Sequence, residues 1–271
     1  MRVGYVFPEG RTRVLTFSYD DGNVADRRLA DILTSCGMKG TFNLNAGWLL
    51  DDNHKTCIKA DELQSLYLDK GHEVACHGFS HPREEMLLHG AMLNDVLQDR
   101  LELEKITGQI IKGMAYPFGS YNQDVIDTLA TAGIVYCRTV ASTNSTSLFP
   151  ASGKDWLTWN PTCHHNGDII RRIDPFLTNR YGLQMLYIWG HSYEFDRMDN
   201  WEVIEEFCDK MKNRKEVWYA TNMEIYQYVE ACRNLETSAD CRTIYNPSCQ
   251  NVFILAEDKV HEIQPGATLH I

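Results

Sequence analysis

Apolar residues along the chain form short runs typical of buried strands, and these alternate with longer runs that have the period of an amphipathic helix. The segments with strand character are 13–19, 40–45, 73–76, 112–116, 134–139, 183–189 and 216–220. The segments with helical character are 24–36, 60–70, 89–107, 123–131, 200–213 and 222–231. Strands that alternate with helices predict parallel βαβ units with right-handed crossovers.

Two regions depart from this alternation. Residues 141–165 are rich in Ser, Thr, Asn and Trp, and they predict a long irregular loop, a kind of segment that commonly carries function. From residue 237 onward the helical runs stop, and turn residues separate short strand-like segments at 243–245, 251–255 and 261–263. We therefore expect a main domain over residues 1–236 and a small β-rich C-terminal extension over residues 237–271.

Composition and charge narrow the class of protein. The length of 271 residues suits one large α/β domain with a small appendage, and the net charge of −11 argues against nucleic acid or anionic membranes as partners. No apolar run approaches the roughly 18 residues that span a bilayer. The first ten residues lack the apolar core of a secretory signal, and the nine cysteines form no CxxC pair. These features predict a cytoplasmic protein with reduced thiols, unless a signal segment has been removed.

The residues that carry the most chemical information follow two of the predicted strands. Asp20-Asp21-Gly22 ends the first strand, and His77 and His81 lie four residues apart after the third. Because the carboxyl ends of parallel strands meet at one rim, these side chains should lie together. The two histidines and one carboxylate make a three-ligand site for a divalent metal ion, with a position left open for water. The other carboxylate can then accept a proton from that water, as in a metal-assisted hydrolase.

Four motifs resemble those of the polysaccharide deacetylases (carbohydrate esterase family four, with the nodulation-protein deacetylase homology domain), and they occur in the same order. They are Ser18-Tyr19-Asp20-Asp21-Gly22, His77-Gly78-Phe79-Ser80-His81-Pro82, Ala115-Tyr116-Pro117-Phe118-Gly119 and Tyr187-Ile188-Trp189-Gly190-His191. The resemblance covers about residues 13–232 and leaves the C-terminal extension outside. It implies a distorted (β/α) barrel of about seven parallel strands with a small C-terminal β appendage.

The resemblance also implies a chemical role for five of the motif residues. Asp21, His77 and His81 would hold the metal ion. Asp20 would be the general base and His191 the general acid on the leaving amine. The expected cofactor is one divalent ion, with Zn²⁺ favoured over Co²⁺, Mn²⁺ and Ni²⁺ because imidazole and carboxylate ligands suit zinc.

The third motif both matches the family and departs from it. Tyr116, Pro117 and Phe118 would border the substrate, and the backbone N–H of Phe118 would help to hold the oxyanion. The family's arginine, which orients the catalytic aspartate, is replaced by Ala115. Our hypothesis is that Arg138, at the end of the next strand, takes its place. Gly78 stands where the family has Ser or Thr, so the loop after His77 needs support from elsewhere.

Further polar and aromatic residues could border the site. Trp159, His164 and His165 lie in the predicted loop, where contact with the substrate competes with a purely structural or solvated role. The ring of His191 could be oriented by Glu194 or by Asp196, and the sequence leaves this choice open.

The function that these observations predict is removal of acetyl groups from N-acetylated, and also O-acetylated, carbohydrate by metal-activated water. One alternative keeps the chemistry but acts on a small non-sugar amide, which a cytoplasmic location would favour. Another alternative is a catalytically silent, metal-containing carbohydrate-binding module, which the missing arginine suggests. The partners expected are an acetylated saccharide or a small amide, and the sequence does not predict an oligomeric state.

Overall fold

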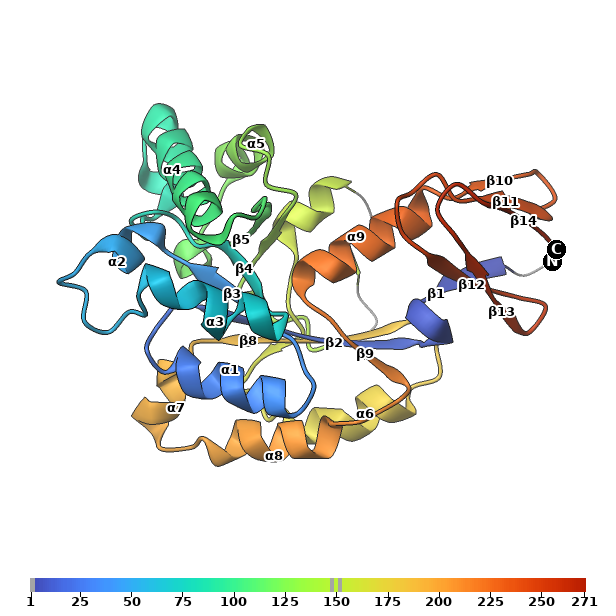
Figure 1. Cartoon of the computed structure of the whole chain (residues 1–271), viewed down its shortest axis with the longest axis horizontal. Helices are drawn as coiled ribbons and strands as arrows, with labels where there is room; N and C mark the ends of the chain where they lie inside the picture. Colours follow the sequence, from blue (N-terminus) through green and yellow to red (C-terminus); the bar gives the residue numbers. More distant parts are fainter. Residues whose placement is uncertain (1–2, 147–148, 151–152) are drawn as a thin grey trace.

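Parallel strands form one curled sheet at the centre of the computed structural model, which describes residues 3–146, 149–150 and 153–271 (Figure 1). The strands are β2 (Arg13–Asp20), β3 (Thr41–Leu44), β4 (Glu73–Cys76), β5 (Gly113–Ala115), β6 (Tyr136–Arg138), β7 (Cys163–His164), β8 (Gln184–Gly190) and β9 (Val217–Tyr219). Seven of them follow the order β6-β5-β4-β3-β2-β8-β7, and β9 pairs with the first half of β2. The distorted (β/α) barrel predicted above is confirmed.

The two edge strands of this sheet are linked by the segment between them. Trp159 forms a parallel bridge with Arg138 of β6, and its backbone N–H donates to the Cys137 carbonyl over 2.9 Å. Shortly afterwards, β7 pairs with β8. The predicted loop 141–165 therefore contains the 3₁₀ segment η6 (Gly153–Thr158) and strand β7, and its positions 147–148 and 151–152 lie outside the described residues.

Helices surround the sheet. They are α1 (Asp26–Ser35), α2 (Ala46–Leu50), α3 (Leu63–Leu66), α4 (His89–Thr107), α5 (Gln123–Thr131), α6 (Ile173–Thr178), α7 (Tyr193–Met198), α8 (Glu202–Met211) and α9 (Asn222–Arg233). The remaining 3₁₀ segments are η1 (Pro8–Gly10), η2 (Ala60–Glu62), η3 (Leu68–Lys70), η4 (Glu84–Met86), η5 (Pro117–Gly119) and η7 (Ile170–Arg172). In Figure 1, α1 and α8 lie on one side of the sheet, and α4 and α5 lie on the other.

Local signals set several helix ends. Asn122 caps α5, because its side-chain oxygen accepts the N–H of Val125. A capping box between Thr221 and Glu224 starts α9. The predicted helix 60–70 is instead divided among η2, α3 and η3. There the buried Tyr67 stacks on a neighbouring strand's Phe42 with ring centroids 4.3 Å apart, and this packing outweighs local helix propensity.

The main core lies between the sheet and these helices. Phe17 of β2, for example, meets Phe207 of α8 edge to face, and both side chains are fully buried. All nine cysteines are free thiols. Cys76, Cys137 and Cys208 are buried, and burial raises their thiol pKa values, so they pack as small apolar groups. Among the described residues, no helix combines the length and apolar character needed to cross a bilayer.

The C-terminal extension forms two small antiparallel sheets beside the barrel (Figure 1). Its strands are β10 (Glu236–Thr237), β11 (Thr243–Tyr245), β12 (Val252–Ala256), β13 (Lys259–Ile263) and β14 (Thr268–His270), and it also includes the N-terminal strand β1 (Val3–Val6). The sheet orders are β1-β12-β13 and β10-β11-β14. The sequence did not predict that β1 pairs with β12. The boundary at residues 236 and 237 stays a prediction.

Helix α9 joins this extension to the barrel through one buried hydroxyl group. The Tyr228 hydroxyl donates to the Val6 carbonyl over 2.6 Å and accepts the Phe253 N–H over 3.1 Å. It therefore binds neighbouring strands β1 and β12 at the same point. Tyr226 lies on the same helix, but its hydroxyl has no hydrogen-bond partner in the part of the chain that the structure describes.

We predict that Tyr228→Phe lowers the free energy of unfolding by about 1–3 kcal/mol, because two buried backbone groups lose their partner while the ring stays in place. Urea unfolding followed by circular dichroism measures this change. The control Tyr226→Phe should change stability by less than about 0.5 kcal/mol. Equal effects of the two substitutions would contradict a joining role for Tyr228.

Candidate active site

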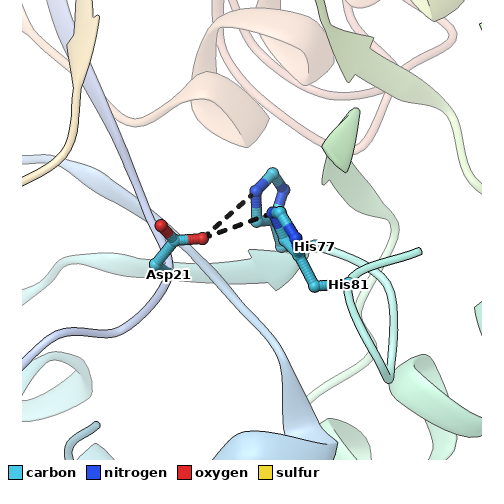
Figure 2. A group of neighbouring side chains, drawn as sticks. All are labelled: Asp21, His77 and His81. Carbon is cyan, nitrogen blue, oxygen red and sulfur yellow. Dashed lines mark ion pairs between the residues drawn. The ribbon is translucent and has the colours of Figure 1, made fainter. Parts of the chain in front are cut away.

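Three side chains from two strand ends converge at the rim of the barrel (Figure 2). The Oδ1 atom of Asp21 lies 3.6 Å from Nε2 of His77 and 3.5 Å from Nε2 of His81. This oxygen is buried and has no hydrogen-bond partner among the described residues. Tetrahedral ligands with bonds of about 2.0–2.1 Å to zinc stand roughly 3.4 Å apart. The donor types, the spacing and the orphaned oxygen therefore fit a divalent metal ion.

Both histidines are set to offer a lone pair. Nδ1 of His77 lies 2.8 Å from the Ala115 carbonyl, which can only accept, so Nδ1 carries the proton and Nε2 is free. Burial, reinforced by the neighbouring His77, lowers the pKa of His81 to about 4. At neutral pH the His81 ring is therefore uncharged, as metal ligation requires.

The backbone is strained where the site is built. Asp21, His81 and Phe118 adopt left-handed φ values of 77°, 54° and 58°, respectively. Such conformations cost about 1–3 kcal/mol each for residues with a Cβ and tend to gather at functional sites. The Phe118 ring lies 4.5 Å from the His81 ring, so two of these residues are also packed together.

The loop that carries the two histidines is held by side chains from other elements. The Asn45 amide donates to the Gly78 carbonyl over 2.7 Å. On α4, Asp99 accepts the His77 N–H and Asp95 accepts the Phe79 N–H. A Cβ at Gly78, where φ is 74°, would meet Pro82 and Glu84 at about 3.1–3.2 Å. These contacts provide the loop support that the absence of Ser or Thr at Gly78 left open.

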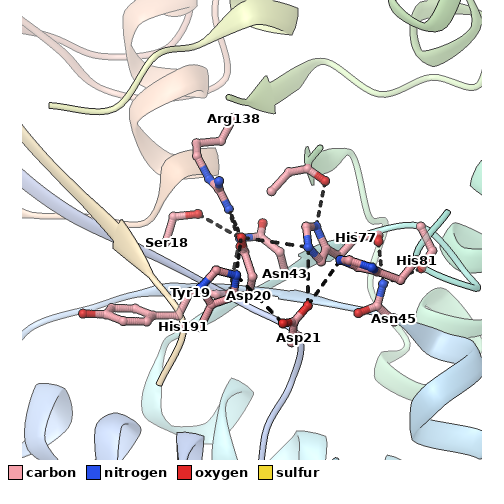
Figure 3. A network of polar contacts seen from close by, with 12 residues as sticks. Ser18, Tyr19, Asp20, Asp21, Asn43, Asn45, His77, His81, Arg138 and His191 are labelled. Carbon is pink, nitrogen blue, oxygen red and sulfur yellow. Dashed lines mark hydrogen bonds and ion pairs between the residues drawn. The ribbon is translucent and has the colours of Figure 1, made fainter. Parts of the chain in front are cut away.

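The second carboxylate of the first motif occupies a different environment (Figure 3). Asp20 is almost fully buried, and Nη2 of the fully buried Arg138 contacts both of its oxygens. Asn43 also donates to Asp20 Oδ1 over 2.8 Å. Burial alone would raise the pKa of Asp20, but Arg138 outweighs it and lowers the pKa to about 2. The structure thus places Arg138 in contact with Asp20, the aspartate that Arg138 was predicted to orient.

His191 faces the carboxylate pair from the end of β8. Its Nε2 lies 3.9 Å from Oδ2 of Asp20 and 3.9 Å from Oδ2 of Asp21. Its Nδ1 lies 3.4 Å from Oε1 of Glu194, whereas Asp196 accepts the Trp201 indole N–H. Of the two acids that could orient the ring, Glu194 is the one in contact with it.

The other predicted site residues divide between rim and core. His164 is partly exposed, with its Nε2 3.0 Å from Glu194 Oε2. Trp159 is 1% exposed, and His165 is buried between Tyr19 and Phe195, so neither side chain offers a free surface to a substrate.

The motif after β5 also contains both buried residues and a residue exposed at the rim. Tyr116 and Pro117 are buried, and the Tyr116 hydroxyl donates to the Leu157 carbonyl over 2.7 Å. Phe118 is instead 55% exposed at the rim. Within this motif, only Phe118 therefore presents a large side-chain surface to solvent near the metal ligands.

A cleft of about 330 Å³ opens beside Asp21. Its lining residues are Asp21, Asn23, Trp48, His54, Thr56, Cys57, Tyr193 and Arg197. The Tyr193 hydroxyl lies 3.3 Å from Asp21 Oδ2, and the Arg197 guanidinium lies over the Tyr193 ring. Trp48 packs against His81 on the opposite wall. The cleft therefore combines aromatic surface with polar groups next to the carboxylate and histidines, as binding sites for small polar molecules do.

Sequence reasoning did not find several residues that build the site. Asn43 lies near the end of β3 and Asn45 follows it, and their position at a strand's carboxyl end was a signal that could have identified them. Asp95 and Asp99 lie within α4, where their spacing looks like that of any exposed helix face. Their contacts with the histidine loop could be recognised only from the tertiary structure.

Comparisons with known proteins were made once this geometry was known. Residues 8–137 match the family model described as polysaccharide deacetylase. No curated protein matches the chain in sequence. Among solved structures, a proposed polysaccharide deacetylase from Mycobacterium smegmatis is 16% identical with a TM-score of 0.62, covering 84% of this chain and 93% of its own.

Two further structures extend this comparison. A family 4 carbohydrate esterase from Streptomyces lividans, in complex with acetate, is 15% identical with a TM-score of 0.50, covering 76% of this chain and 91% of its own. The deacetylase PplD of Streptococcus pyogenes, in complex with acetate, is 18% identical with a TM-score of 0.47, covering 53% of this chain and 61% of its own. At such low identity, the structures from Mycobacterium smegmatis and Streptomyces lividans bear on the fold alone.

The fold and the family match together indicate a hydrolase of the polysaccharide deacetylase type. The matched residues 8–137 include the first three of the four motifs, and the match confirms their resemblance to the polysaccharide deacetylases.

We predict that Arg138→Met destabilises the fold by about 3–5 kcal/mol at pH 7, because it leaves the Asp20 carboxylate buried without its cation. In the Asp20→Asn background, Arg138→Met should lower the free energy of unfolding by much less. Urea unfolding of the unmodified protein, the two single variants and the double variant gives the coupling energy between the two side chains. Because the folded-state pKa of Asp20 is depressed, its stabilisation is complete above pH 3.8 and is lost as the pH falls toward 2. If the two substitutions lower the free energy of unfolding additively at pH 7, the two side chains do not interact.

Proposed function

We propose that this protein removes acetyl groups from N-acetylated carbohydrate by metal-assisted hydrolysis. The observation that carries the proposal is one rim on which a His₂–Asp ligand set, a buried carboxylate and a histidine lie within 4 Å of one another. These are the groups that amide hydrolysis needs: a place for a Lewis acid, a proton acceptor and a proton donor.

Asp21, His77 and His81 would hold the metal ion, which supplies Lewis-acid polarisation of the acetyl carbonyl and lowers the pKa of water to about 7. Zn²⁺ fits the donor set best. The backbone N–H of Phe118, next to His81, would help to stabilise the negative charge that develops on the carbonyl oxygen.

Asp20 and His191 would divide the proton transfers between them. The Arg138 contact keeps Asp20 ionised, so it can take a proton from the attacking water. Burial alone would lower the pKa of His191, but Glu194 and the aspartates outweigh it and raise the pKa, so His191 can hold a proton for the leaving amine. The two groups lie near one another but are held in opposite protonation states.

The alternatives receive less support. A silent binding module was suggested because the family's arginine is missing. Arg138 contacts Asp20, so the site has an arginine beside this aspartate and that reason no longer applies. A small non-sugar amide remains the second candidate, because the cleft of about 330 Å³ accommodates only a small part of a polymer.

We predict acetate release from N-acetylated chitooligosaccharides that a chelator abolishes and Zn²⁺ restores. Asp20→Asn should still bind zinc but lose about 10²–10⁴-fold in turnover, because the proton acceptor is gone. Enzymatic detection of acetate, with zinc binding measured by calorimetry, checks both points. Chelator-resistant turnover would contradict the role of the metal, and full activity of Asp20→Asn would contradict the role of the base. Activity only on small amides would favour the second candidate.

A second prediction concerns the pH profile. Glu194→Gln removes a carboxylate that raises the pKa of His191, so the general acid should lose its proton at lower pH. The alkaline limb of kcat/KM against pH should then move to lower pH. The control Asp196→Asn alters a carboxylate that contacts Trp201, and it should leave the profile in place. Identical profiles for Glu194→Gln and the unmodified protein would contradict the assigned proton donor.

A further inference from the structure

A second group of histidines surrounds the carboxylate of Glu194. Oε2 of Glu194 lies 3.0 Å from Nε2 of His164 and 3.1 Å from Nε2 of His165, and Oε1 lies 3.4 Å from Nδ1 of His191. Three imidazoles thus face a single acid. The group spans adjacent strands and the following helix, because His164 ends β7, His191 follows β8 and Glu194 lies on α7.

Two of these three contacts lack the geometry of a hydrogen bond. Nε2 of His165 and Nδ1 of His191 are buried, yet neither has a hydrogen-bond partner among the described residues. The Asp21 oxygen in the first ligand set has the same combination of close imidazoles and no hydrogen bond. Buried ring nitrogens that face a carboxylate without a formed hydrogen bond are an arrangement that a cation satisfies.

We propose that His164, His191 and Glu194 form a second divalent-cation site beside the first. One donor atom from each of these residues lies within 4.8 Å of the others, a limit that the set of Asp21, His77 and His81 also meets. Two imidazoles and one carboxylate suit a borderline ion such as Zn²⁺ better than Mg²⁺ or Ca²⁺, which prefer oxygen ligands. His165, which touches Glu194 but is fully buried, would position the carboxylate.

The second site should bind more weakly than the first. Nδ1 of His164 accepts the Asn166 N–H over 3.2 Å, so Nε2 of the free ring carries the proton. A metal ion must displace that proton before it can bind. In the first site, the Ala115 carbonyl already holds the proton of His77 on Nδ1, away from the ligand set. The second binding event should therefore release a proton and saturate at higher metal concentration.

Occupation of this site would act on catalysis through His191, a consequence that rests on the proposed function. The ring presents Nδ1 to Glu194 and Nε2 to Asp20 and Asp21. A cation on Nδ1 occupies the lone pair that a second proton would need, so the ring cannot become an imidazolium acid. Metal ion in excess would then inhibit the enzyme that one equivalent activates.

Calorimetric titration of the metal-free protein with Zn²⁺ tests the proposal directly. We expect two binding events, with the tighter one lost in His77→Ala. Glu194→Gln and His164→Ala should each weaken the second event at least about tenfold while the tighter event remains, which also shows that these variants fold. His261→Ala, in β13 of the extension, is the matched control and should keep both events. All these variants retain the nine cysteines, so binding at thiols would be unchanged among them.

Saturation at one equivalent, or a second event that persists in both Glu194→Gln and His164→Ala, would overturn the second site. The activity assay adds an independent measurement, since excess Zn²⁺ should inhibit the unmodified protein and inhibit His164→Ala much less. Two binding events without any acetate release would instead contradict the proposed function and leave the second site supported.

Discussion

The ion pair between Asp20 and Arg138 is the interaction on which the organisation of the site depends. Both side chains are buried, and they come from strands β2 and β6, which have three other strands between them in the sheet. A carboxylate in such surroundings would take up a proton unless a cation stood beside it. The pair therefore keeps Asp20 charged and fixes the distance across the barrel rim. The neighbouring Asp21, which points to the histidines, remains available as a ligand.

The sequence predicted the parts of the fold that depend on local pattern. The helices α4 and α5 begin and end where the pattern places them, because a glycine follows the last turn of each helix. The two-residue strand β7 and the pairing of β1 with β12 were missed, because short segments that depend on a distant partner have no periodicity of their own. The domain boundary, the location and the substrate remain predictions.

For the site, the motifs located the residues but not the relations between them. Arg138 was considered only because a family arginine was absent, and the structure supplies the contact with Asp20. The left-handed backbone at Asp21 and His81 cannot be read from residue types that rarely adopt it. The meeting of three histidines at Glu194 depends on how the segment from Trp159 to His164 closes the barrel, which no local pattern describes.

The pairing of β1 with β12 has a consequence for how the chain is assembled on the ribosome. Val3 pairs with Ala256 in this ladder, so β1 cannot find its neighbour until synthesis has reached β12. The barrel between them can form earlier from sequential βαβ units, whereas this sheet has high contact order and closes last. Until then the nascent N-terminal strand is an unpaired edge, the kind of segment that chaperones protect from aggregation.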